Sequence, residues 1–298
     1  MKKLSDAKKS ILGNMIIRQT IGGVRKEDRI KDKDELKERI NKECEKQDSK
    51  ATGKVDLTML DVSKVDDMSD LFTEFNYLKS IDVSNWSVGY VESMSYMFCD
   101  CKSLESIDVS NWNVSNVEDM HCMFYGCKSL ESIDVSKWNV DKVKNMHSMF
   151  DSCSSLKSID VSNWNVSNVK CIWCMFYGCL SLESIDVSSW NINDIADMNN
   201  MFSYCSSLKS IDVSNWNVSN VNDMYAMFYK CSSLESVDVS NWDVSNVENM
   251  DSMFCDCSSL KSIDVSNWNV SNVRNMSCMF NNCKFDYKKI KNKLIKKY

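Results

Sequence analysis

Apolar and polar residues follow a pattern along most of the chain that returns every 26 residues. In one copy Leu104, Ile107 and Val109 show an L-x-x-L-x-L spacing, and the polar residues between them face the other way in an extended segment. This spacing predicts a short β-strand at the start of each copy. Eight copies follow without an insertion, each marked by one Trp: Trp86, Trp112, Trp138, Trp164, Trp190, Trp216, Trp242 and Trp268.

The second half of each copy carries apolar residues at a different spacing. Val117, Met120, Phe124 and Cys127 are separated by three, four and three positions, which places them on one stripe of a helix. A Ser, Asp or Asn that suits a helix N-cap, such as Ser115, precedes the stripe in seven of the eight copies. We therefore predict one short helix per repeat.

Stacking of the copies is the next expectation, because one strand and one short helix cannot bury their own apolar faces. It predicts an α/β solenoid of leucine-rich-repeat type, with a parallel sheet on one side and helices on the other. At about 4.8 Å per strand, eight copies make a stack about 40 Å long. The chain has no Pro and only 7 Gly among 298 residues, so Asn, Ser and Asp must supply its turns.

Four segments follow from this pattern. Residues 1–50 are a basic, partly helical leader, and residues 51–77 are a degenerate capping repeat. Residues 78–283 hold the eight repeats, and the Lys-rich segment 284–298 is predicted to form a C-terminal capping helix.

The caps can be traced in individual residues. Leu60 replaces the Trp of the degenerate copy, and Phe75 replaces its Cys. In the leader, Leu36 and Ile40 lie on one face of a charged helix predicted near residues 33–47. We expect both terminal helices to cover the open ends of the stack.

Charge is unevenly distributed along the chain. The net charge of −6 divides into +5 for residues 1–50, +6 for residues 284–298 and −17 for the segment between them. An acidic body repels nucleic-acid phosphates, so we expect no nucleic-acid partner. The apolar stretch 11–17 is interrupted by Gly13 and Asn14, so the sequence predicts neither a signal peptide nor membrane insertion. A cytoplasmic monomer is the resulting expectation.

The repeat reads I-D-V-S-x-W-x-V-x-x-V-x-x-M-x-x-M-F-x-x-C. Over residues 55–283 it resembles the bacterial 26-residue surface-protein repeat family, the leucine-rich-repeat-like proteins of BspA type. The resemblance implies a repeat scaffold found at cell surfaces and involved in adhesion and host interaction. It implies no enzymatic activity for the repeat itself.

Two repeated columns admit a functional and a structural interpretation. The Trp column could stack a ligand such as a sugar, but eight identical positions are what packing between coils requires. The Cys that ends each apolar stripe could serve metal or disulfide chemistry. However, evenly spaced single Cys lack the C-x-x-C pairing of zinc sites, and 15 Cys suit a reducing compartment. We predict buried, unpaired thiols at Cys101, Cys127, Cys153, Cys179, Cys205, Cys231, Cys257 and Cys283.

Charged columns run along the predicted strands. Stacking would bring the carboxylates of Asp108, Asp134, Asp160 and Asp186 about 5 Å apart. Neighbouring Ser hydroxyls favour a hydrogen-bonded structural ladder, and a calcium ladder is the alternative. A second column alternates in sign at six of its seven steps, which favours one strand register: Lys79, Glu105, Glu131, Lys157, Glu183, Lys209, Glu235 and Lys261.

Chemistry for catalysis is sparse, so we predict no enzyme, no cofactor and no metal. The two His, at positions 121 and 147, have no carboxylate fixed beside them by spacing, and no nucleophile-elbow, P-loop or dinucleotide-binding motif occurs. Positions off the apolar stripe vary between copies and include exposed aromatics, which binding sites use. They predict a protein-binding face on the helical side, formed by His121, Tyr125, His147, Trp173, Tyr177, Tyr225 and Tyr229.

Overall fold

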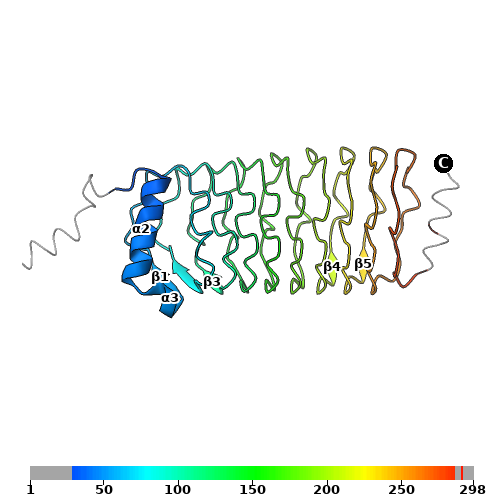
Figure 1. Cartoon of the computed structure of the whole chain (residues 1–298). Coiled ribbons are helices and arrows are strands. Elements are labelled where there is room, and N and C mark those ends of the chain that lie inside the picture. Colours follow the sequence, from blue (N-terminus) through cyan, green and yellow to red (C-terminus); the bar gives the residue numbers. More distant parts are fainter. Residues whose placement is uncertain (1–28, 286–289, 291–298) are drawn as a thin grey trace, which may run out of the picture.

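In a computed structural model, the chain forms an elongated solenoid whose coils stack side by side (Figure 1). The structure describes residues 29–285 and residue 290. Two helices, α2 (Lys33–Lys46) and α3 (Ser49–Thr52), precede the coils. The strands are β1 (Lys54–Asp56), β2 (Ser80–Asp82), β3 (Ser106–Ile107), β4 (Ser210–Ile211) and β5 (Ser236–Val237).

The strands pair in parallel at a register of one repeat. Strand β1 pairs with β2 and β2 with β3, so that Ser80 lies beside Ser106, and β4 pairs with β5 in the same way. A single bridge between Ser158 and Ser184 continues the pairing in the middle of the stack. The predicted leucine-rich-repeat-like solenoid with parallel strands is therefore confirmed.

The predicted helix of each repeat is wrong. Among the described residues the only helices of four residues or more are α2 and α3, and each apolar stripe lies in a series of turns. Two residues per repeat, such as Tyr96 and Asp100 with φ of 57°, are left-handed, which interrupts a right-handed helix. Backbone N–H groups bond the next repeat instead: Met94 N–H donates to Asp119 O at 2.9 Å and Phe98 N–H to Met123 O at 2.8 Å.

The apolar stripe itself is buried as expected. Turns closed by hydrogen bonds three residues apart, such as Cys101 N–H to Phe98 O at 3.1 Å, return a side chain to the interior every three or four positions. Val117, Met120, Phe124 and Cys127 are all fully buried. A helix and this series of turns both bury every third or fourth residue, so the sequence pattern alone does not distinguish them. The predicted helix is wrong for this reason.

The core consists of columns of identical side chains. Trp138 and Trp164 stack in parallel with ring centroids 6.3 Å apart, and Phe72 and Phe98 stack at 5.0 Å. Each column Trp also donates its indole N–H to a carbonyl 29 residues earlier, as Trp164 does to Val135 O at 3.1 Å. This burial and pairing confirm the structural interpretation of the Trp column.

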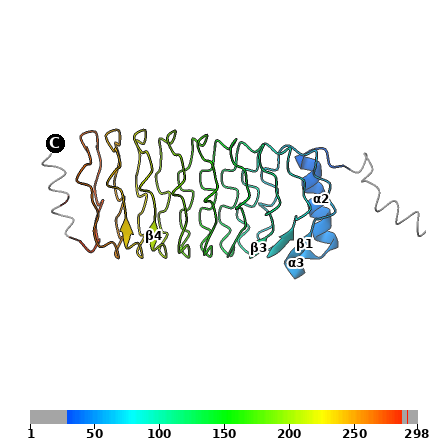
Figure 2. The same ribbon diagram turned by 180° about the vertical axis from the view of Figure 1, so that it is seen from behind.

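The helix predicted near residues 33–47 is α2, which covers the first coil (Figures 1 and 2). Asp32 caps it by accepting the Glu35 N–H at 2.9 Å, and its apolar face buries Leu36 and Ile40 completely. Asp, Lys and Glu residues occupy the opposite face. The predicted C-terminal helix, 284–298, lies outside the described residues except for positions 284, 285 and 290.

The Cys column is hydrogen-bonded throughout, and it is buried from Cys101 to Cys257 but only half-buried at Cys283. Cys101 Sγ donates to Phe72 O at 3.3 Å and Cys153 Sγ to Phe124 O at 3.1 Å, and the same bond recurs along the column. Burial raises the pKa of these thiols. Each sulfur therefore faces a backbone carbonyl in the interior.

We expect thiol titration of the denatured, unreduced protein to find nearly all 15 Cys free. In the folded protein the column thiols should react orders of magnitude more slowly than the exposed Cys278, because a buried thiol with a raised pKa supplies little thiolate. Finding four or more disulfides in the denatured protein would contradict the prediction.

Candidate interaction face

The turns in the second half of each repeat form a further surface, which parallel bridges such as Ser93 with Asp119 join from repeat to repeat. We call it the turn face and define it by residues 92–100 and their equivalents at 26-residue steps. The backbone bonds between repeats hold this surface in register, because alternate N–H groups donate across each step. Side chains off the apolar stripe therefore form columns over a rigid support.

Four rings form a continuous stack on the turn face, which we call the aromatic ladder. His147 and Trp173 stack at a centroid distance of 4.1 Å with an interplanar angle of 7°. His121 and His147 stack at 4.7 Å, and Tyr96 meets His121 edge-on at 4.6 Å. The predicted residues His121, His147 and Trp173 are thus brought together.

A second group, the tyrosine cluster, lies further along the stack. Tyr204 contacts Tyr177 at 5.5 Å and Tyr229 at 5.2 Å, edge-on in both cases. Lys230 Nζ lies 4.8 Å from the Tyr204 ring centroid and 5.1 Å from that of Tyr229, within cation–π range. Tyr177 and Tyr229 are therefore joined through a third ring.

The other two predicted residues are more exposed. Tyr225 retains 40% of its accessible surface and Tyr125 retains 36%. Tyr125 precedes Gly126, whose φ of +71° and close approach to the Asp100 side chain leave no room for a Cβ. Both rings are available to a partner.

Sequence reasoning missed three members of these groups, Tyr96, Tyr204 and Lys230. All three occupy the left-handed positions of their repeats, with φ of 57°, 62° and 59°. That conformation turns the side chain toward the neighbouring column, which a helical projection does not do. Scanning every non-stripe position for aromatics would have found the two Tyr.

Charged groups accompany the aromatic ladder. His121 Nδ1 lies 2.7 Å from Asp119 Oδ1. Burial, followed by the nearby His121, lowers the pKa of His147. His147 Nδ1 is buried and has no hydrogen-bond partner in the part of the chain that the structure describes. The sequence predicted no carboxylate beside either His, and this prediction is wrong for His121, which contacts Asp119.

The strand face carries the Asp column, and Ser hydroxyls satisfy it. Ser110 donates to Asp108 Oδ1 both through its backbone N–H at 3.1 Å and through its hydroxyl at 2.7 Å. The same pair of bonds holds Asp134, Asp160 and Asp186, and the bonds lower the pKa of Asp134 and Asp186. Within residues 29–285, no three His, Cys, Asp or Glu side chains are grouped to hold a metal ion.

The alternating charged column pairs across strands as predicted. Lys157 Nζ lies 2.7 Å from Glu131, Lys209 Nζ lies 2.8 Å from Glu183, and two further pairs join Lys79 with Glu105 and Lys261 with Glu235. These pairs are exposed, so they add little stability and mainly support one register.

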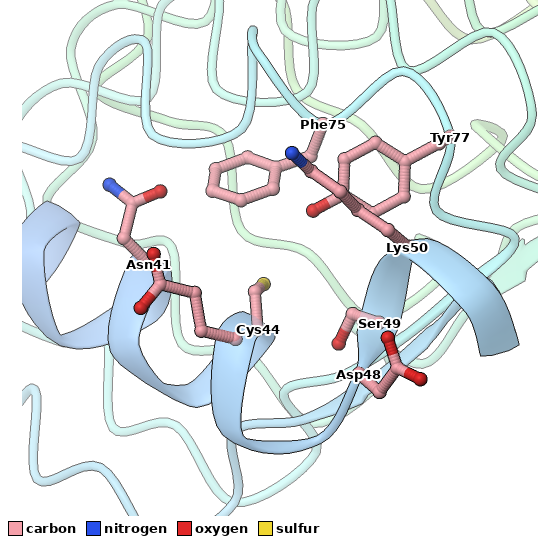
Figure 3. A pocket seen from close by; sticks show the side chains of 8 residues that line it. Asn41, Cys44, Asp48, Ser49, Lys50, Phe75 and Tyr77 are labelled. Atoms are coloured by element: carbon pink, nitrogen blue, oxygen red, sulfur yellow. The ribbon is translucent and has the colours of Figure 1, made fainter.

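A pocket of about 310 Å³ lies between the N-terminal helices and the first coil (Figure 3). Cys44 of α2 and Ser49 of α3 face the rings of Phe75 and Tyr77 across it. Desolvation raises the pKa of the Cys44 thiol. The rim of the pocket carries both acidic side chains and Lys50, so the pocket favours neither an anionic nor a cationic ligand.

No helix within the described part of the chain combines the length and apolar character that a membrane crossing requires.

Comparison with known proteins places the repeat in a family. The model of the family described as "Mycoplasma protein of unknown function, DUF285" matches residues 42–134, 107–211 and 197–296. No curated protein sequence matches the chain.

Solved structures of low sequence identity are also similar. The TLR13–ssRNA13 complex is 16% identical, with a TM-score of 0.35 over 85% of this chain and 38% of that one. An internalin of Listeria monocytogenes is 13% identical, with a TM-score of 0.34 over 80% of this chain and 72% of the internalin chain. A leucine-rich repeat protein from Bacteroides ovatus is 17% identical, with a TM-score of 0.23 over 72% and 78%. The chain thus spans well under half the length of TLR13.

Proposed function

The chain belongs to the family of Mycoplasma proteins of unknown function, DUF285, and from its turn face we propose that it is a non-enzymatic scaffold that binds a protein partner. The observation that carries the proposal is the aromatic ladder, in which His121, His147 and Trp173 stack across three successive repeats. Large, rigid aromatic side chains on a fixed support are what protein interfaces use as anchors.

The difference between repeated and variable positions supports this function. Core columns carry nearly the same residue in every copy, whereas turn-face columns change from copy to copy. A surface that only had to remain soluble would favour Lys and Glu over Trp, Tyr and His. The aromatics instead gather in neighbouring repeats.

Two settings fit such a scaffold. The resemblance to BspA-type repeats favours a surface protein that takes part in adhesion or host interaction. An intracellular binding module is the alternative. Fractionation of cells, followed by protease treatment of intact cells, distinguishes them, because only a surface protein is cleaved from outside.

A cation-binding solenoid is the minor alternative, based on Asp108, Asp134, Asp160 and Asp186. The double Ser bonds to each carboxylate favour a structural role. We expect millimolar calcium to leave the melting temperature unchanged, whereas a calcium ladder would raise it.

We expect replacement of Tyr125, Trp173, Tyr177 and Tyr229 by Ser to abolish partner binding and leave the circular-dichroism melt nearly unchanged. The rings are partly exposed and lie outside the buried core columns, so their loss removes contact area without opening a core cavity. The measurement is binding to a partner first identified by pull-down with the wild-type chain.

The matched control replaces the four strand-face residues Asp108, Asp134, Asp160 and Asp186 by Asn. It changes four side chains of the strand face, outside the turn face, and should leave binding intact. If the aromatic variant still binds while the Asn variant does not, the strand face is the site and the proposal is wrong.

A further inference from the structure

A nearly buried carboxylate lies in the middle of the turn face. Asp151 keeps only 8% of its surface exposed, and the Ser152 hydroxyl donates to its Oδ1 at 2.7 Å. Within the described residues no Lys, Arg or His forms an ion pair with it. Desolvation raises the pKa of Asp151 to about 6. The carboxylate therefore lacks the cation that usually accompanies a buried acid.

The two repeats beside Asp151 carry the same six residues. Residues 122–127 and 174–179 both read Cys-Met-Phe-Tyr-Gly-Cys, and no other copy has this sequence. Asp151 holds the equivalent position in the repeat between them, so Tyr125 and Tyr177 are its neighbours in the column. The charge of Asp151 raises the pKa of both phenols. It is the largest cause at Tyr125, whereas at Tyr177 desolvation comes first and the nearby Tyr204 second.

The tyrosine cluster shows what the space between two such rings accommodates. Tyr177 and Tyr229 are also two repeats apart, and the ring of Tyr204 contacts both. The equivalent position between Tyr125 and Tyr177 is Ser152, whose side chain is too short to contact two rings. Residues two repeats apart, such as Tyr125 and Tyr177, are separated by about 10 Å. A planar group between them needs about 3.5–4 Å to each ring, so one such group fits.

We propose that Tyr125, Asp151 and Tyr177 form a binding site for an arginine side chain of the protein partner. The guanidinium lies between the phenol rings, where Tyr204 lies in the neighbouring site, and pairs with the Asp151 carboxylate. It fits because it is planar, stacks on aromatic faces and bonds carboxylates with two parallel N–H groups. The inference rests on the proposed function and identifies the chemistry of the partner.

The site requires ionised Asp151, so binding depends on pH. A cation binds the charged form only, and its affinity is constant above the pKa of Asp151 and falls about tenfold per pH unit below it. The neighbouring thiols stay neutral there, because desolvation raises the pKa of Cys122 to about 11 and of Cys174 to about 12. His147, on the adjacent ladder, also titrates, with its pKa lowered by burial, so a variant is needed to isolate the contribution of Asp151.

The test uses short peptides and the whole chain. Acetyl-Gly-Arg-Gly-amide and its citrulline analogue, which keeps the shape but not the charge, are titrated by ligand-observed NMR between pH 5 and 8. We expect the citrulline peptide to bind at least tenfold more weakly. Asp151→Asn should weaken the arginine peptide at least tenfold and abolish the loss of affinity below pH 6.

A second variant tests the site by filling it. Ser152→Tyr places a ring where Tyr204 lies in the neighbouring site, and the backbone accommodates it, since φ is 61° at Ser152 and 62° at Tyr204. It should abolish peptide binding and lower the melting temperature only by the loss of the Ser152 hydroxyl bond to Asp151. Asp251→Asn, which removes a carboxylate from the turn face four repeats away, is the control and should bind like the wild type.

Three results would overturn the assignment: no binding of the arginine peptide to the wild type, equal binding of the citrulline peptide, or unchanged binding by Asp151→Asn and Ser152→Tyr. These results are separable from failure of the proposed function. If the four-Ser variant loses its partner but Asp151→Asn keeps it, the turn face is the interface and only the arginine site is wrong.

Discussion

We expect Trp164→Ala to lower the free energy of unfolding by about 3–5 kcal/mol, the usual cost of truncating a buried Trp. The side chain is 2% exposed and stacks on Trp138 at 6.3 Å. Its loss leaves a cavity between coils and removes the indole N–H that bonds Val135 O at 3.1 Å. The buried carbonyl then loses a donor, which adds to the cost.

The effect should depend on position in the stack. Trp268→Ala should cost less, because Trp268 lies in a repeat where Ile263 and Val273 are only partly buried. Trp173→Ala is the second control, since Trp173 lies on the turn face. Urea unfolding, monitored by circular dichroism, ranks the three variants by their loss of unfolding free energy, and hydrogen exchange shows which coils open. Small and equal effects at Trp164 and Trp268 would mean that the Trp column does not hold the coils together.

The second large effect is expected at the N-terminal cap. Ile40→Asp should release α2 from the first coil, at a cost above about 3 kcal/mol, because it removes a fully buried side chain and introduces an unpaired charge. Contacts in a solenoid are limited to neighbouring coils. Hydrogen exchange should therefore increase in α2 and β1 first, while the central repeats keep their protection.

An exposed residue of the same helix provides the control. Lys42→Ala removes an ion pair with Glu38 that lies in solvent, and we expect it to change stability by less than about 0.5 kcal/mol. If Ile40→Asp has an equally small effect, or unfolds the whole stack at once, α2 is not a local cap.

The 26-residue period was sufficient to predict the stack, its parallel register and its core. Identical residues at a fixed period must lie beside one another once the coils stack, so the positions of the Trp and Cys columns follow from spacing alone. The same reasoning predicted the ion pair between Lys157 and Glu131. When charges alternate along a column, opposite signs meet only if equivalent positions of adjacent repeats lie side by side.

The tertiary structure decided how the second half of each repeat folds. An isolated segment with apolar residues at intervals of three and four would satisfy its backbone as a helix, by bonds within itself. In the stack, the N–H groups of Met94, Tyr96, Phe98 and Asp100 find carbonyls in the next repeat. Left-handed residues such as Tyr96 are then tolerated, because the neighbouring coil compensates for the strain.

This choice also determined the candidate site. The sequence placed His121, His147 and Trp173 in one column, and that part of the site was predictable. The contacts of Tyr96 and Tyr204 depend on the left-handed backbone, which directs their rings toward the next column. Periodicity determines which residues become neighbours in the stack, whereas the side chains that meet on its surface depend on backbone bonds that form only between stacked coils.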